Sequence, residues 1–100
     1  MANEIEVLET FYKQPADVQD YDVNYTRYLR GLADTPRVVD PYEVDVPAGI
    51  TLETASISGN TIKVWLSGGT AGQKYKVTTR MFTLGGRVKE AEIVIHVKEI

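Results

Sequence analysis

The sequence contains no cysteine among its 100 residues, and it has one histidine, His96, and one tryptophan, Trp65. Without cysteine, disulfide bonds and cysteine-based zinc sites are excluded, and synthesis in a reducing cytoplasm is favoured. A single histidine leaves no His–His or Cys–His arrangement for a metal ion or an activated nucleophile. We therefore expect no metal, no cofactor and no enzymatic activity of these kinds.

Long apolar runs and an excess of positive charge are also missing. No stretch approaches the roughly 20 apolar residues that a membrane-spanning helix needs, and the acidic start at residues 1–6 lacks the features of a secretory signal. The net charge of −3 gives no electrostatic basis for sequence-independent binding to nucleic acid. We expect a globular protein whose partners include neither a membrane nor a nucleic acid.

Short runs of Val, Ile, Thr and Tyr dominate from about residue 37 onward, separated by Gly, Pro, Asn and Ser. This spacing predicts a β-sandwich or barrel. We expect an all-β protein, an immunoglobulin-like or fibronectin III-like antiparallel β-sandwich of about seven strands. Residues 11–100 would form this single domain, and residues 1–10 would precede it as an N-terminal arm or edge strand.

The clearest element is a hairpin in which Gly59-Asn60 joins residues 50–58 to residues 61–66. Both turn residues tolerate positive φ, as a two-residue hairpin loop demands. The resulting register pairs Ser58 with Thr61, Ile57 with Ile62, Ser56 with Lys63, Ala55 with Val64 and Thr54 with Trp65. Trp65 then projects outward beside Lys63, unless the sheet is covered on both sides.

A second hairpin is predicted from residues 73–82 and 87–98, with Leu84-Gly85-Gly86 as its loop. A two-residue loop would set apolar positions against charged ones, so three residues are favoured. The register then pairs Tyr75 with Ile95, Val77 with Ile93, Thr79 with Ala91 and Arg80 with Glu90. Tyr75, three residues after Gly72, could be a tyrosine corner, whose hydroxyl bonds to upstream backbone.

The first 36 residues allow two interpretations near the N-terminus. Ile5, Leu8 and Tyr12 could line a helix, whereas Ile5, Val7 and Phe11 could belong to an extended strand, and we favour an edge strand. Alternating apolar and polar positions over residues 20–25 predict a further strand. Residues 26–30 can close one helical turn before Gly31.

Two segments imitate binding motifs. Residues 20–24 copy the start of a calcium-binding EF-hand loop, but Tyr25 stands where that loop needs glycine and Gly31 where it needs glutamate. Residues 68–74 resemble a phosphate loop, but they lead into a strand rather than a helix. We interpret the first as outward polar positions of a strand and the second as a flexible connection between strands.

The remaining charged residues fit a solvated surface better than a catalytic site. Glu90 and Glu92 would be outward carboxylates on one strand, and His96 points away from the apolar row of the same strand. Four basic residues could form a local patch, but the two glutamates beside them would cancel much of its field. These residues are Lys63, Lys74, Lys76 and Arg80.

One segment resembles a known family. The run VWLSGGTAGQKYKVT at residues 64–78, followed by a strand, Gly86-Arg87 and a second strand, resembles small Ig-like phage and prophage proteins described as fibre-tail adaptors. Residues 11–17, 20–29 and 46–51 are similar to upstream landmarks of that family in the same order. The resemblance covers about residues 11 to 98.

The resemblance implies a virion structural protein of the neck, tail or fibre attachment region, made in the bacterial host cytoplasm. It would be present in several copies of a symmetric assembly and would join portal or neck, tail or fibre proteins without catalytic residues. The alternative is an Ig-like binding module that recognises a cell-surface carbohydrate. For the adaptor function, we expect contacts through an N-terminal arm, an exposed aromatic ring and the glycine-rich loop, whereas a carbohydrate module would use an exposed aromatic platform. These candidate interface residues are Ile5, Val7, Leu8, Trp65, Gly68, Gly69 and Thr70.

Overall fold

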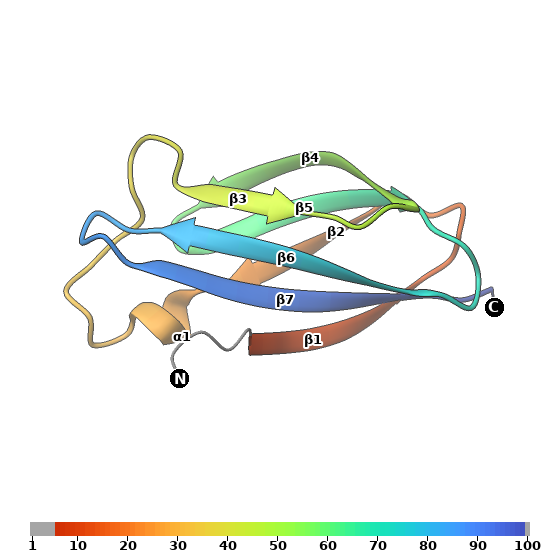
Figure 1. Cartoon of the computed structure of the whole chain (residues 1–100), viewed down its shortest axis with the longest axis horizontal. Helices are drawn as coiled ribbons and strands as arrows, with labels where there is room; N and C mark the ends of the chain where they lie inside the picture. The colour runs from red at the N-terminus through yellow and green to blue at the C-terminus, as the bar shows by residue number, and fades with distance from the viewer. Residues whose placement is uncertain (1–5, 100) are drawn as a thin grey trace.

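Two β-sheets face each other in the computed structural model, which describes residues 6–99 (Figure 1). One sheet has four strands in the order β1 (Glu6–Lys13), β7 (Val88–Val97), β6 (Lys74–Phe82) and β3 (Tyr42–Asp45). The other has three, in the order β2 (Gln19–Asn24), β5 (Thr61–Gly68) and β4 (Ile50–Ser58). One short helix, α1 (Thr26–Leu29), completes the described part of the chain. The predicted all-β sandwich of about seven strands is confirmed at this level.

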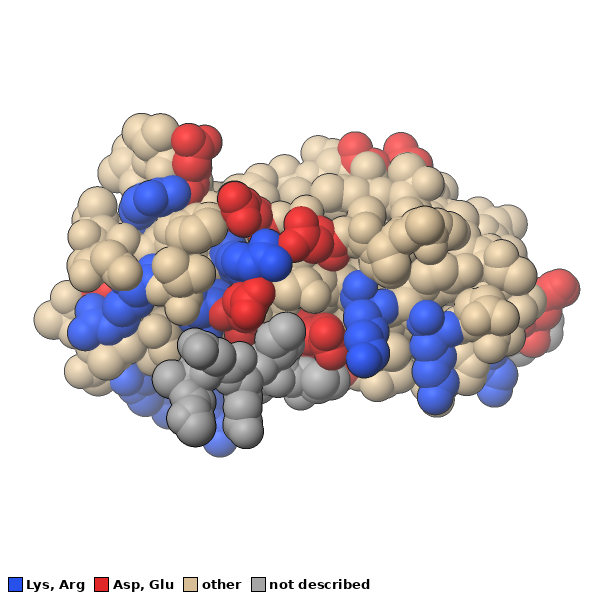
Figure 2. Space-filling model, in the orientation of Figure 1, with Lys and Arg blue, Asp and Glu red and all other residues tan. Residues whose placement is uncertain are grey.

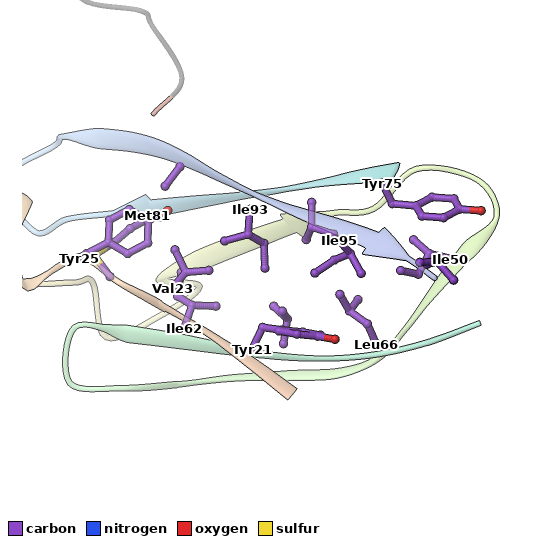
Figure 3. Packing of buried hydrophobic residues seen from close by; sticks show 14 of the residues in the cluster. Tyr21, Val23, Tyr25, Ile50, Ile62, Leu66, Tyr75, Met81, Ile93 and Ile95 are labelled. Carbon is purple, nitrogen blue, oxygen red and sulfur yellow. The ribbon is translucent and has the colours of Figure 1, made fainter. Parts of the chain in front are cut away.

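The core lies between the two sheets, and many charged side chains lie on the surface (Figure 2). Apolar side chains at alternate positions of the strands point inward and meet across the interior (Figure 3). Val64 and Leu66 of β5 and Ile95 of β7 are completely buried. Burial of one such side chain stabilises a fold by about 1.5–3 kcal/mol, so this interior is the main source of stability.

Both hairpins have the predicted registers. All five expected pairs between β4 and β5 are present, from Ser58 opposite Thr61 to Thr54 opposite Trp65. The four expected pairs between β6 and β7 are present as well. The loop Leu84-Gly85-Gly86 is closed by a 2.9 Å hydrogen bond from the Thr83 N–H to the Arg87 carbonyl. Face patterns and turn residues were therefore sufficient to set these registers.

β1 is an edge strand, as favoured from the sequence, but it runs parallel to β7. Phe11 lies opposite Ile95 and Lys13 opposite Val97. The expectation of a purely antiparallel sandwich is wrong at this pair. The two strands come from opposite ends of the sequence, so no tight turn imposes antiparallel pairing on them. β1 runs across residue 10, where the sequence predicted the boundary between an N-terminal arm and the domain. That boundary stays a prediction.

β2 and α1 confirm the predicted strand and helical turn before Gly31. Tyr21, Val23 and Tyr25 are buried in the core. The side-chain oxygen of Asn24 accepts a 2.8 Å hydrogen bond from the Thr26 N–H, which forms an Asx turn just before the helix. Among the residues that the structure describes, no helix is long and apolar enough to cross a membrane.

Candidate interaction surfaces

Trp65 lies on the outer face of the three-stranded sheet, and its side chain is 37% exposed. β5 is the central strand, so Trp65 is opposite Asp20 of β2 on one side and Thr54 of β4 on the other. Of the two alternatives left by the sequence, the structure has the outward, uncovered ring. We call this outer surface around Trp65, with Asp20, Asp22, Glu53 and Lys63, the Trp65 face.

Ion pairs and hydrogen bonds organise the Trp65 face. The Lys63 ammonium lies 2.8 Å from an Asp20 carboxylate oxygen and 3.0 Å from one of Asp22. The hydrogen bond from Lys63 lowers the pKa of Asp20, and the same contacts raise the pKa of Lys63. The two carboxylates of residues 20–24, the segment that resembles the start of an EF-hand loop, therefore bind the Lys63 ammonium. The sequence interpretation of outward strand positions is confirmed.

Negative charge exceeds positive charge on this face. Glu53, at a register shift in β4, accepts a 2.5 Å hydrogen bond from the Ser67 hydroxyl. The face therefore carries three carboxylates and one ammonium, and two of the carboxylates, Asp20 and Asp22, bind that ammonium. The face offers one aromatic ring within an acidic, hydrogen-bonding surface, a composition that suits contact with a basic partner surface.

The glycine-rich loop after β5 is held by Tyr75. The Tyr75 hydroxyl accepts a 2.9 Å hydrogen bond from the Thr70 N–H, which confirms the predicted tyrosine corner. A further hydrogen bond of 2.8 Å joins the Gly72 N–H to the Val97 carbonyl. Gly69 has φ +96°, and a Cβ placed there would lie 2.6 Å from a Val97 methyl carbon. Glycine at position 69 therefore allows this loop to pack closely against Val97.

Lys13 anchors the same loop from β1, a role that sequence reasoning missed. Its buried ammonium donates hydrogen bonds to three carbonyl oxygens, at 2.6 Å for Gly68, 2.9 Å for Gln14 and 3.3 Å for Pro15. Burial lowers the pKa of Lys13, and the negative charge of Asp17 opposes that shift. No local pattern distinguishes this lysine, because lysines at strand ends are usually exposed.

An open pocket of about 460 Å³ lies at the same end of the molecule. Its lining comes from the turn after β1 and from the C-terminal segment: Gln14, Pro15, Ala16, Asp17 and Glu99. One Asp17 carboxylate oxygen accepts a 3.1 Å hydrogen bond from the Gln14 N–H. These residues form a surface hollow beside the turn rather than a cleft with opposed acid and base groups.

The outer face of the four-stranded sheet carries an ion-pair cluster around Arg80. Its guanidinium lies 2.7 Å from carboxylate oxygens of Asp45 and of Glu90, and 3.4 Å from one of Glu43. Lys63 belongs to the other sheet, so the four basic residues grouped from the sequence do not share one patch. Arg80 is surrounded by negative charge instead.

Two further polar residues of β7 have different surroundings. Glu92, expected to be a solvated carboxylate, is buried, and that expectation is wrong. It lies in the middle of a strand paired on both sides, opposite Val7 and Thr78, where neighbouring strands shield it. His96 packs its ring 5.3 Å from that of Tyr12. Across residues 6–99, no three His, Cys, Asp or Glu side chains gather to hold a metal ion.

The candidate interface residues do not form one surface. Trp65 is on a sheet face, whereas Gly68 is the last residue of β5, and Gly69 and Thr70 begin the loop that follows. Val7 and Leu8 are in β1, but their side chains are not described, and Ile5 lies outside the described residues. Their roles in binding stay predictions. Sequence reasoning also missed a group of exposed aliphatic side chains that includes Val38 and Val39, in the segment before β3.

Comparison with known protein families gives one match. A family model described as "Podophage GP4 fiber-tail adaptor protein gp77" matches residues 13–96. The matched segment begins at the last residue of β1 and ends one residue before the end of β7, so it covers most of both sheets. A comparison with curated proteins finds no match.

Proposed function

The chain belongs to the podophage fibre-tail adaptor family, and from this premise we propose that it is a non-enzymatic virion structural protein. In this role it joins other phage proteins through contacts on its surface. The observation that carries the proposal is the family match, because residues 13–96 include Trp65, the glycine-rich loop and nearly all of the core. The resemblance recognised in the sequence pointed to the same family.

We further propose that the protein acts in the neck, tail or fibre attachment region. It is made in the cytoplasm of the bacterial host and then assembles in several symmetric copies with portal or neck, tail or fibre proteins. The family description supports the tail and the fibre as partners. A small domain with a single rigid core supports a connector, since such a domain holds its outer faces in fixed relative positions.

We propose an Ig-like fold for the sandwich, and the strand order supports it. The sheet β2-β5-β4 has the order of the Ig strands B, E and D, and β3-β6-β7 has that of C, F and G. β1 would then be the first Ig strand, moved to the edge beside the last one. The tyrosine corner of Tyr75 near the start of β6 supports the same correspondence, because this feature occurs near the start of strand F.

Several charged side chains on the outer sheet faces are paired with one another, and this pairing supports a function without catalysis. Asp20 and Asp22 bind Lys63, and Glu90 binds Arg80, on the flat outer faces of the sheets. General acid–base catalysis instead needs a carboxyl group positioned toward a substrate, often with a pKa near the working pH. Surface ion pairs of this kind are typical of a solvated or interface-forming sheet.

Trp65 is the residue through which we propose to test the adaptor function. Its ring lies outside the core, so Trp65→Ala should leave the domain folded while weakening its binding to tail or fibre proteins of the same phage. The matched control is Val18→Ala, which truncates another exposed apolar side chain. Pull-down with the purified tail and fibre proteins measures binding, and circular dichroism measures folding.

Two results would contradict this proposal. Undiminished binding of the Trp65→Ala variant would remove Trp65 from the interface, and global unfolding would place its ring in the core. The carbohydrate-binding alternative makes a different prediction for the isolated domain. A glycan bound by the monomer and lost in the Trp65→Ala variant would favour a carbohydrate module over an adaptor.

A further inference from the structure

Two segments that are far apart in the sequence lie side by side at the end of the molecule that carries α1 (Figure 1). The Arg37 N–H donates to the Phe82 carbonyl at 2.9 Å, and the Leu84 N–H donates to the Thr35 carbonyl at 2.9 Å. The chain between Arg37 and Pro41 therefore projects from a paired base. We call residues 35–41 and 82–88 together the valine end.

Aliphatic side chains are unusually exposed at the valine end. Val38 is 87% exposed and Val39 72%, and Leu84 and Val88 are each more than half exposed. Single exposed aliphatic residues are common, but four of them in two adjoining segments indicate an interaction site. Trp65, in comparison, is 37% exposed.

The projecting loop is held in a defined shape. The Arg37 guanidinium donates a 2.7 Å hydrogen bond to the Asp40 carbonyl across the loop, and it lies 4.7 Å from the centre of the Phe82 ring. Asp40 has φ +49°, a conformation that only a few non-glycine residues adopt. Because the loop is braced, the two valines can bind a partner with little additional loss of conformational entropy.

This end of the molecule is also basic. Residues 26–41 and 82–89 carry five basic side chains and two carboxylates, a surplus of three positive charges. The whole chain has a net charge of −3, so the remainder has a surplus of six negative charges. Blue side chains gather at this end in Figure 2. The basic residues are Arg27, Arg30, Arg37, Arg87 and Lys89, and the acidic residues are Asp34 and Asp40.

The combination of charge and exposed aliphatic groups limits the possible partners. A second valine end would repel this one, because both are positive. Nucleic acid would satisfy the charges but would leave the four aliphatic side chains without an apolar contact. An acidic surface that includes an apolar group satisfies both properties. The remainder of the same chain supplies such surfaces, because it holds the surplus of negative charge.

The Trp65 face is the surface of a second copy that fits best. It combines an exposed aromatic ring with the carboxylates of Asp20, Asp22 and Glu53, which outnumber its one lysine. The cluster of Glu43, Asp45, Glu90 and Arg80 on the opposite sheet has the same balance of charges, but it includes no aromatic ring. We propose that the valine end of one copy docks on the Trp65 face of the next copy. This contact rests on the proposed function and specifies how its several copies are joined.

Such a contact joins two different surfaces, so a docked pair keeps one free Trp65 face, on the first copy, and one free valine end, on the second. Repetition of the contact closes a ring or extends a filament, depending on the rotation between neighbours. In none of these assemblies does a valine end meet another valine end, so a copy that has lost one of the two surfaces can bind only through the other. This property gives the proposal a specific test.

The experiment uses the full chain and sedimentation velocity over a range of protein concentrations. The wild-type protein should self-associate, and a rise in salt concentration from about 0.05 M to about 0.5 M should weaken the association because the contact is charge-complementary. The double variant Val38→Ser/Val39→Ser should raise the apparent dissociation constant at least about tenfold, a change typical of lost interface anchors. The control Val18→Ser, at another exposed valine, should leave it unchanged.

Mixing two variants separates this contact from other forms of association. A Trp65→Ala copy retains its valine end, and the double valine variant retains its Trp65 face. Each variant alone should remain monomeric, whereas the mixture should form a dimer that does not grow further. If Trp65→Ala fails to fold by circular dichroism, Glu53→Lys replaces it as the variant with an altered Trp65 face.

Three results would overturn the proposal. The first is a wild-type protein that stays monomeric up to about 1 mM, a concentration at which even weak contacts form. The second is a mixture that associates no better than either variant alone. The third is binding of duplex DNA, measured by fluorescence anisotropy, that depends on Arg37 and Arg87. A monomer that still binds purified tail or fibre proteins would reject this contact and leave the adaptor function intact.

Discussion

Two charged side chains, Lys13 and Asp34, join distant segments from buried positions. The ammonium of Lys13 binds three carbonyl oxygens and so ties β1 to the loop after β5. Hydrogen bonds to a charged group contribute more than neutral ones, about 1.5–3 kcal/mol. Such residues are hard to predict from sequence, since a lone Lys or Asp usually indicates exposure and its partners lie far away along the chain.

Asp34 joins the segment after α1 to the β6–β7 turn. Its almost fully buried carboxylate accepts hydrogen bonds from the Gly85 N–H at 2.9 Å and from the Arg87 guanidinium at 2.8 Å. Hydrogen bonds from Thr83, Arg87 and the backbone of Gly85 and Thr35 lower the pKa of Asp34 to about 2, against an ordinary value of 3.8. The folded protein therefore favours the ionised carboxylate more strongly than the unfolded chain does.

The lowered pKa of Asp34 predicts a specific acid sensitivity. Its contribution to stability should be complete above pH 3.8 and should decline as the pH falls from there toward about 2. Urea unfolding at several pH values measures this decline. In the Asp34→Asn variant, stability at neutral pH should be lower and the decline over this window shallower. An equally steep decline in the variant would assign the acid sensitivity to other carboxylates.

At the scale of elements, the sequence was most informative where turns and sheet faces constrain each other. Gly59-Asn60 set the register of one hairpin, and the need to keep apolar positions from facing charged ones set the loop length of the other. The parallel pairing of β1 with β7 carries no local signal, since it depends on how the chain crosses between sheets. The segment before β3 was also missed, because its backbone bonds to β6 rather than within itself.

The loop between β5 and β6 gives a test of close packing at Gly69. Gly69→Ala places a methyl group 2.6 Å from a Val97 carbon at φ +96°, so it combines backbone strain with a steric clash. Gly72 has φ +92° but no atom within 4 Å of the added carbon, so Gly72→Ala carries the backbone strain alone. We expect both variants to be destabilised, and Gly69→Ala by about 1–3 kcal/mol more.

Thermal unfolding of the two alanine variants measures this difference. The melting temperature of Gly69→Ala should fall clearly below that of Gly72→Ala. Equal melting temperatures would show that the loop can move away from Val97, and that its glycines serve backbone conformation alone.

At the scale of the whole molecule, the hairpin register predicted which face carries Trp65 and left open whether that face is covered, whereas the valine end did not follow from any sequence pattern. Residues 35–41 come beside the end of β6 only when their backbone bonds to Phe82 and Leu84. The surplus of positive charge around them combines residues from α1, the following loop and the β6–β7 turn. The net charge of the whole chain, −3, gives no indication of this local surplus of positive charge.

Cryo-electron microscopy of the purified phage particle tests the adaptor function most directly. The sandwich should fit density at the junction of tail and fibre, in several symmetric copies, with Trp65 buried against a neighbouring protein. Absence of the chain from purified particles, or its density at a site that contacts neither tail nor fibre, would contradict the proposed function.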